Sequence, residues 1–149
     1  MTEIRFYHLT RSTLEQVLPD LLEKTLERGL KALVMAGSPE RVESLTQHLW
    51  TYQPNNFLPH GNAKDGNAEL QPIWLTAQDE RPNGADFLFL MDGASSSRLK
   101  DYQRVCELFD GNDPAAVDEA RRRWKQYKAD GHTISYWQQD ECGWQNVGG

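Results

Sequence analysis

The sequence predicts an α/β domain of three layers, in which a mostly parallel central sheet carries helices on both faces. Two observations support this class. Short apolar runs such as Asp86–Met91 (DFLFLM) lack polar alternation, which is typical of strands that are buried on both faces. Such runs alternate along the chain with segments whose apolar residues recur at helical spacing, and this order is expected of β-α-β units with a parallel sheet.

The first strand is predicted at Glu3–Leu9, because both of its faces are partly apolar. A helix follows, and its N-terminus is predicted at Ser12, which together with Glu15 matches the capping-box pattern. Leucine and valine then recur at helical spacing as far as Gly29, which ends the helix. Pro19 lies inside this helix, where it should kink the helix or separate its first turn.

A second strand and helix follow in the same order. The strand is predicted at Lys31–Ala36, and Ser38 then caps a helix that Pro39 opens and that runs to about Trp50. The next residues, Thr51–Gln71, are rich in Pro, Asn and Gly and show no sustained period. They are predicted to form a long loop, and such a loop inside a compact domain is usually functional or mobile.

The rest of the chain supplies further strands and one more helix. We expect a single domain over residues 1–141 and a frayed tail over residues 142–149, because the chain after Gln138 is polar and ends in two glycines. The further strands are predicted at Pro72–Thr76, Asp86–Met91, Arg104–Phe109 and His132–Trp137, with a polar turn at Asp79–Gly84 and a helical turn at Leu99–Tyr102.

The helix before the last predicted strand has both ends marked. Asp113 is a suitable N-cap, and Pro114 falls at the first helical position, where its missing N–H is harmless. Gly131 is a natural stop at the other end. Acidic residues lie in the first turns and basic residues in the later ones, which complements the helix dipole. These charged residues are Asp118, Glu119, Arg121, Arg122, Arg123, Lys125 and Lys128.

The two faces of this helix indicate what it could bind. Arg121, Lys125 and Lys128 form a basic row directly beside an apolar stripe. Such a surface suits an acidic peptide end, since Arg and Lys pair with carboxylates while an adjacent apolar notch takes a side chain. Alternatively, the aromatic residues of the stripe are core and the basic row is a solvated face. The stripe consists of Ala116, Val117, Ala120, Trp124 and Tyr127.

The composition argues against several classes of function. The 149 residues carry a formal net charge of −6, with a pI of about 5.2, whereas nonspecific nucleic-acid binding depends on a positive surface. Any role with DNA is therefore expected to be indirect. We expect no membrane segment, no signal peptide and a cytoplasmic protein, because no apolar run has membrane-spanning length. Cys106 and Cys142 form no CxxC pair, and Cys106 is expected to be a small buried hydrophobe.

Searches for catalytic chemistry find weak candidates. Parallel sheets bind ligands at the carboxyl ends of their strands, but neither Gly37 nor the Asp110–Asp113 segment belongs to a phosphate-binding fingerprint. Asp92, Asp110 and Asp113 lie near strand ends and could hold Mg²⁺ in a phosphoryl-transfer or nuclease-like domain. Alternatively, these carboxylates belong to turns and a helix cap. The histidines share no metal-ligand spacing, so we expect no catalytic residue, metal or cofactor.

Trp50 and Phe57 place large aromatic groups at the end of a helix and in the long loop that follows it. Apolar clusters carried by loops often form partner interfaces, because aromatic anchors contribute most of the binding energy there. Alternatively, both side chains fasten the loop to the sheet.

Five stretches of the sequence together resemble one known family. They are FYHLTRS near the N-terminus, LWTYQPNNFLPHG ending at Gly61, NGADFLFLMDG, FDGND, and RWKQYKADGHTISYWQQDE ending at Glu141. In this order and spacing they are similar to the chi subunit of the bacterial DNA polymerase III holoenzyme. The resemblance covers nearly the whole chain, to about Glu141, and implies a Rossmann-like α/β fold.

The resemblance also implies a function without catalysis. Chi-family proteins are accessory subunits of the clamp-loader complex, which bind the acidic C-terminal tail of the single-stranded DNA-binding protein and join the clamp loader through the psi subunit. A direct nucleic-acid-binding module is the other alternative, and the acidic pI argues against it. By position, the family's tail-binding residues correspond to Arg121, Trp124 and Lys125, with Lys128 nearby, and its psi-binding residues to Trp50 and Phe57.

Overall fold

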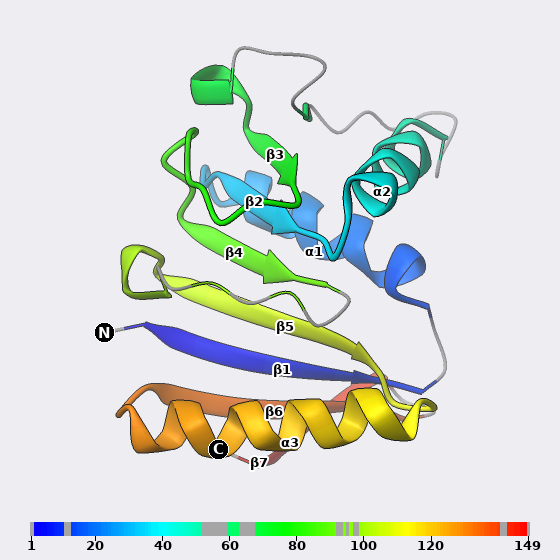
Figure 1. The fold of residues 1–149 in the computed structure, drawn as a ribbon, viewed down its shortest axis with the longest axis vertical. Helices are drawn as coiled ribbons and strands as arrows, with labels where there is room; N and C mark the ends of the chain where they lie inside the picture. The colour runs from blue at the N-terminus through cyan, green and yellow to red at the C-terminus, as the bar shows by residue number, and fades with distance from the viewer. Residues whose placement is uncertain are drawn as a thin grey trace.

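The computed structural model describes residues 2–10, 13–51, 60–62, 68–91, 94, 96, 99–140 and 143–148, with the backbone alone at residues 50–51, 68, 139–140 and 143–148. These residues form one seven-stranded sheet with helices on both faces (Figure 1). The strands are β1 (Glu3–Leu9), β2 (Ala32–Met35), β3 (Ile73–Thr76), β4 (Phe87–Leu90), β5 (Arg104–Asp110), β6 (Thr133–Asp140) and β7 (Gly143–Gly148). The helices are α1 (Leu14–Glu27), α2 (Pro39–Thr51) and α3 (Pro114–Ala129), with 3-10 turns at Ala68–Leu70 and Leu99–Asp101.

The strand order is β3-β2-β4-β5-β1-β6-β7, and every neighbouring pair is parallel except β6 and β7. The chain crosses the sheet in one direction through α1 and α2, and in the opposite direction through α3. Right-handed crossovers therefore place α3 on one face and the other two helices on the other (Figure 1). The predicted three-layer, mostly parallel, Rossmann-like sandwich is confirmed.

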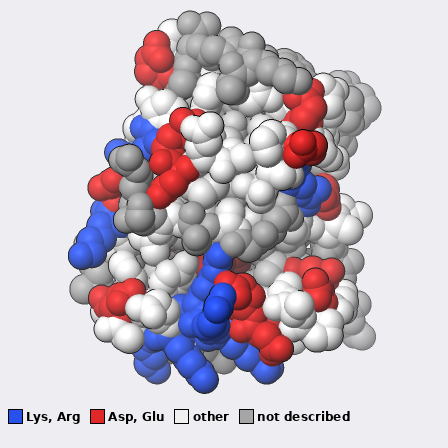
Figure 2. Space-filling model, in the orientation of Figure 1, with Lys and Arg blue, Asp and Glu red and all other residues white. Residues whose placement is uncertain are grey.

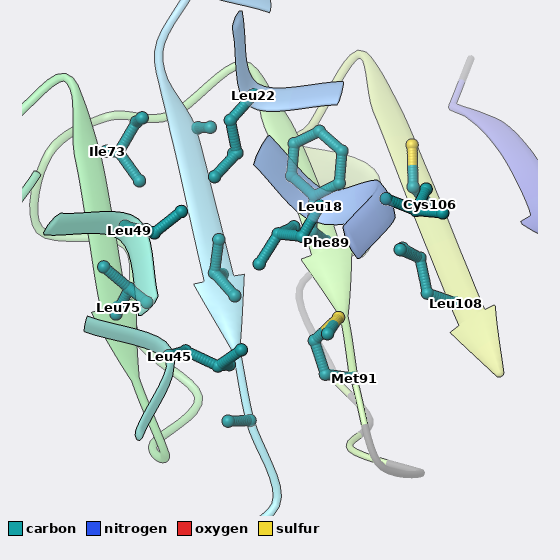
Figure 3. Close-up of a cluster of buried hydrophobic side chains, with 14 of the residues drawn as sticks. Leu18, Leu22, Leu45, Leu49, Ile73, Leu75, Phe89, Met91, Cys106 and Leu108 are labelled. Carbon is teal, nitrogen blue, oxygen red and sulfur yellow. The ribbon is translucent and has the colours of Figure 1, made fainter. Parts of the chain in front are cut away.

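The core consists of two apolar clusters, one on each face of the sheet. In β1, Tyr7 and Leu9 point to the cluster under α1 and α2, whereas Ile4 and Phe6 point to the cluster under α3. Figure 3 shows the first cluster, in which side chains of both helices meet side chains of β3, β4 and β5. Burying one Leu or Phe side chain contributes roughly 1.5–3 kcal/mol, so these layers are the main stabilising feature of the fold.

The N-terminus of α1 differs by one residue from the prediction. Thr13 is the N-cap: its hydroxyl oxygen accepts from the Gln16 N–H at 3.2 Å, and the Gln16 side-chain oxygen accepts from the Thr13 N–H at 2.9 Å. The expected box of Ser12 with Glu15 therefore does not cap the helix, and Ser12 itself lies outside the described residues. The reason is tertiary, because the Glu15 carboxylate forms an ion pair with Arg41 of α2.

Helix α1 also continues through Pro19, so its first turn is not separated as the sequence suggested it could be. A proline inside a helix cannot donate to the carbonyl four residues earlier, which here is the carbonyl of Glu15. His48 of α2 hydrogen-bonds this carbonyl through its Nε2 instead. The second helix thus supplies the bond that the proline removes, and this contact joins α1 to α2.

The C-terminal segment differs from the expected frayed tail. Strand β6 continues to Asp140, and residues 143–148 form β7, which pairs antiparallel with it. In this register Gln139 lies opposite Trp144, and Trp137 lies opposite Asn146. The pairing has a physical reason, because it satisfies backbone groups that β6 would otherwise expose as an edge strand. Cys142 lies outside the described residues.

The predicted loop at Thr51–Gln71 is described only at residues 60–62 and 68–71. Gly61 pairs with β3: its N–H donates to the Ile73 carbonyl at 3.0 Å, and its carbonyl accepts from the Leu75 N–H at 2.9 Å. Asn62 then donates from Nδ2 to the Thr46 hydroxyl of α2 at 3.0 Å. This part of the loop therefore fastens α2 to the edge of the sheet.

Among the described helices, none combines the length and apolar character needed to span a bilayer.

Candidate functional site

Helix α3 forms as its sequence predicts. The Asp113 carboxylate caps the N-terminus by accepting from the Ala115 N–H at 3.0 Å, and Pro114 occupies the first helical position. Gly131 has a φ of 86°, a left-handed conformation that glycine adopts without strain, and it follows the C-cap residue Asp130. The bounds of this helix fix which side chains face the sheet.

The predicted apolar stripe of α3 rests on the sheet. Ala120 and Tyr127 are 5% and 7% exposed, while Ala116, Val117 and Trp124 are half-buried against the same cluster. The half-buried state of Trp124 is important, because this indole contributes both to the core and to the surface beside α3.

Trp124 lies in a cluster of aromatic rings from β1 and β6. Its ring centroid is 5.7 Å from that of Phe6 and 5.8 Å from that of Tyr136, and both contacts are edge-to-face. The Tyr136 hydroxyl lies 2.6 Å from His8 Nδ1, and the His8 ring packs against Phe109 with a centroid distance of 5.1 Å. The indole is thus held in one orientation by its neighbours. The sequence reasoning did not select His8 or Tyr136, although both lie on the same face of adjacent strands.

The basic row of α3 is exposed to solvent as predicted. Arg121, Lys125 and Lys128 are all exposed, and so is Arg122. Helix α3 carries five basic and two acidic residues, a net charge of +3 in a chain whose net charge is −6. Figure 2 shows Lys and Arg side chains gathered at the lower edge of the molecule, where Figure 1 places α3. The helix is therefore a local cationic surface on an acidic protein.

The charge of Arg121 reaches the aromatic cluster. Burial lowers the pKa of His8, and the Arg121 charge lowers it further, although Gly111 and Asp110 oppose the shift. Burial raises the pKa of Tyr136, and Arg121 opposes that shift. Arg121 is therefore close enough to the ring cluster that holds Trp124 for its charge to act on both groups. Charge and aromatic surface meet at this edge of the helix.

Arg123 has a different role from the other basic residues. Its guanidinium points inward, where Nη1 lies 2.7 Å from a Glu107 carboxylate oxygen and donates to the Ala94 carbonyl at 2.7 Å. The Tyr127 hydroxyl donates to the other Glu107 oxygen at 3.2 Å. Burial raises the pKa of the Glu107 carboxyl to about 7, while Arg123 and Tyr127 oppose this shift. The sequence signal for this buried pair was a glutamate inside the apolar run of β5.

The carboxylates at the strand ends serve local structure. Asp113 caps α3, and the Asp110 carboxylate accepts from the Asn112 N–H at 2.8 Å. The Gly111 N–H donates to the Leu9 carbonyl at 2.7 Å, so this turn joins the ends of β5 and β1. Asp92 lies outside the described residues. Within the described part of the chain, no group of three or more His, Cys, Asp or Glu residues is placed to hold a metal ion.

The structure brings together only part of the predicted site residues. Arg121, Trp124, Lys125 and Lys128 share α3. The side chain of Trp50 and the whole of Phe57 lie outside the described residues, although the backbone of Trp50 belongs to the last turn of α2.

Comparison with known proteins places the chain in a family. A family model described as DNA polymerase III chi subunit, HolC, matches residues 1–135. This chain belongs to the chi subunit family of DNA polymerase III. The matched range includes all of α3, so the basic row and Trp124 lie inside it. Family membership confirms the resemblance seen in the sequence and connects the chain with DNA replication.

Two relatives are named as chi subunits. A probable DNA polymerase III subunit chi from Rickettsia prowazekii (strain Madrid E) is 29% identical over 108 residues, which are 70% of this chain and 66% of that protein. The chain therefore spans just under two thirds of the length of this relative. The DNA polymerase III subunit chi of Haemophilus influenzae (strain ATCC 51907 / DSM 11121 / KW20 / Rd) is 25% identical over 137 residues, which are 88% of this chain and 93% of that protein.

Proposed function

We propose that this protein is a non-catalytic accessory subunit of the DNA polymerase III complex, in which α3 binds the acidic C-terminal tail of the single-stranded DNA-binding protein. A second surface joins the psi subunit or another component of the clamp loader, and contact with DNA is indirect. The observation that carries this proposal is the exposed basic row beside Trp124 on an otherwise acidic chain. A small cationic surface of this kind attracts an acidic peptide, while the net negative charge of the protein opposes binding to nucleic acid.

The spacing of the basic row suits an extended acidic peptide. Arg121 and Lys125 are four residues apart on one face of α3, which places their Cβ atoms about 5–6 Å apart. Lys128 continues the row by nearly one turn. Charge-assisted hydrogen bonds contribute about 1.5–3 kcal/mol each when partly buried, but exposed pairs contribute roughly 0.2–1 kcal/mol. Because these side chains are exposed, charge pairing supplies only part of the binding energy.

The apolar part of the contact comes from Trp124. Phe6 and Tyr136 fix the orientation of its indole, so little conformational freedom is lost when a peptide side chain packs against it. Burying one apolar side chain contributes roughly 1.5–3 kcal/mol. The tail therefore places its terminal apolar residue beside Trp124 and its carboxylates on Arg121 and Lys125.

The test is a calorimetric titration with a peptide that copies the C-terminal end of the organism's own single-stranded DNA-binding protein. The Arg121→Ala/Lys125→Ala variant is expected to weaken binding roughly 2- to 30-fold, since it removes two exposed charge pairs that contribute roughly 0.2–1 kcal/mol each. Arg122→Ala is the matched control, because Arg122 is exposed on the same helix but pairs with Glu119. Its affinity should equal that of the wild type.

Each outcome of this titration bears on the proposal. Binding should weaken as salt rises, because exposed charges are screened. If the Arg121→Ala/Lys125→Ala variant binds as tightly as the wild type, the tail site is not on α3. If the wild type does not bind the peptide at all, the adaptor function is refuted.

The surface for the psi subunit is proposed at Trp50 and Phe57, from the resemblance to the family. Helix α2 ends at Thr51, and the Asn62 contact to Thr46 holds the returning chain beside the helix. In a co-purification with psi, Trp50→Ala/Phe57→Ala should lose the partner while retaining calorimetric binding of the tail peptide. Retention of psi by this double variant would show that the interface lies elsewhere.

A further inference from the structure

A cavity of about 240 Å³ lies on the face of the sheet opposite α3. We name it the α1 cavity, because Lys24 of α1 and its C-cap residue Arg28 form one side of it. Its floor comes from β4, β5 and β1, and Trp137 of β6 forms the other side. No residue of the proposed α3 surface belongs to its described lining, so the two sites are independent.

The cavity follows from the topology of the sheet. Helix α1 packs against β2 and β5, whereas α3 covers β5 and β6 on the opposite face. On the α1 face, the described helices therefore leave the sheet uncovered between α1 and β6. The floor of this uncovered area is a row of aligned strand positions in which Phe89, Cys106 and Arg5 are neighbours across the sheet. Figure 3 shows Phe89 and Cys106 at the β4–β5 end of the core.

The lining of the α1 cavity is strongly cationic. Among the described residues that line it, none is acidic. Glu3 lies beside the cavity, and one of its carboxylate oxygens is shared by Arg5 Nε at 2.7 Å and Arg104 Nε at 2.6 Å. The four cations and this one carboxylate leave a local charge of +3. The four cations are Arg5, Lys24, Arg28 and Arg104.

The other polar groups of the cavity do not reduce this charge. Burial raises the pKa of the Tyr7 hydroxyl and of the Cys106 thiol to about 12 each, so both groups are neutral at neutral pH. Burial alone would raise the pKa of Glu3, but its hydrogen bonds and ion pairs with the two arginines lower it on balance. Glu3 is therefore a carboxylate that is already occupied by two guanidinium groups.

Aromatic rings hold the cations at the cavity rim. The guanidinium carbons of Arg104 and Arg28 lie 4.6 Å and 5.4 Å from the centroid of the Phe87 ring, and that of Arg5 lies 5.5 Å from the Trp137 centroid. Cation–π contacts of this kind orient a guanidinium without neutralising its charge. The cavity therefore presents positioned cations next to apolar walls before any ligand arrives, which lowers the entropic cost of binding.

We propose that the α1 cavity binds the end of an acidic peptide segment of a protein partner, with a carboxylate held by Arg5, Arg28 and Lys24 and an apolar side chain against Trp137. The size of the cavity supports this occupant, because pockets for cofactor-sized ligands usually hold about 300–1,000 Å³. The net charge of −6 argues against a nucleic acid, which would be repelled by the rest of the surface. Arginine clusters are a known means of reading acidic peptides.

The test uses the full chain, labelled with ¹⁵N, and the probe peptide acetyl-Glu-Glu-Phe with a free C-terminal carboxylate. The Trp137 indole N–H is the reporter, since it donates to the Ser135 hydroxyl at 2.9 Å and its ring forms a cavity wall. The wild type is expected to show saturable shifts of this resonance. In Lys24→Glu/Arg28→Glu, two exposed positions that leave the core intact, the affinity should fall about tenfold or more.

Two controls separate this site from α3. The Arg121→Ala/Lys125→Ala variant should bind the probe at the α1 cavity with unchanged affinity, and the same peptide with an amidated C-terminus should bind more weakly. Absence of saturable Trp137 shifts in the wild type would overturn the proposal, as would unchanged affinity in the α1 double variant. Tighter binding of a decathymidylate than of the peptide at this reporter would also overturn it, in favour of a nucleic-acid ligand.

Discussion

Replacing Glu107 with glutamine is expected to change how the stability of this protein depends on pH. The carboxyl group is buried, with 5% of the residue exposed, and lies 2.7 Å from Arg123 Nη1 under α3. Burial raises its pKa from 4.5 to about 7, despite the opposing effects of Arg123 and the Tyr127 hydroxyl. The folded protein therefore holds this proton more tightly than the unfolded chain does.

The sign and size of the effect follow from proton linkage. A group whose pKa is raised on folding stabilises the folded state below its unfolded pKa, here 4.5, and this contribution is lost as the pH rises through about 7. At about 1.4 kcal/mol per unit, the shift corresponds to about 3 kcal/mol. Relative to Glu107→Gln, the wild type should thus lose up to about 3 kcal/mol of unfolding free energy between pH 4.5 and pH 7.

The assay is urea denaturation of wild type and Glu107→Gln at half-unit steps from pH 4 to pH 8, with the difference in unfolding free energy plotted against pH. Contributions of other titrating groups cancel in this difference. Glu119→Gln is the control, because Glu119 also contacts Arg123 but lies at the surface, and its difference curve should stay within about 0.5 kcal/mol of zero. A flat difference curve for Glu107→Gln would refute the reasoning, since it would mean that folding does not change the pKa of this carboxyl.

Three further predictions concern the fold. Gly111→Ala should lower the unfolding free energy by about 1–3 kcal/mol in urea denaturation, because a Cβ there would lie 2.0 Å from His8 Cδ2. The same substitution should cost less in a His8→Ala background, where only the Leu9 carbonyl oxygen remains close, at 2.9 Å. His48→Ala should lower the unfolding free energy by about 1–2 kcal/mol, because it removes the hydrogen bond to the Glu15 carbonyl. The cost should be smaller in a Pro19→Ala background, where the N–H of residue 19 can donate to that carbonyl, and equal costs in both backgrounds would contradict this role of His48. In a variant without Cys142, Cys106 should not react with a thiol reagent at pH 8 until the protein unfolds, because it is 2% exposed and its thiol pKa is about 12. Fast labelling of the native state would contradict this prediction.

The sequence by itself determined the class of fold, the positions of the helices and of the parallel strands, and the faces of α3. Each of these rests on short-range interactions. Asp113 and Gly131 mark the ends of α3 through backbone groups one to four residues away, and the apolar stripe follows from the helical repeat alone. The residues of the proposed tail site could be predicted for the same reason, since Arg121 and Lys125 share a face of any helix that spans them.

The tertiary structure alone decided which side chains meet across the sheet. The packing of α3 on β5 places Glu107 under Arg123, and the pairing of β1 with β6 places His8 beside Tyr136, 128 residues away in the sequence. The cationic α1 cavity likewise needs four strands and a helix to be adjacent. The position of the α1 N-cap also depended on a distant partner, because Glu15 forms an ion pair with Arg41 of α2. Charged side chains take whichever counterion the topology brings within reach, and local sequence patterns carry no information about that distance.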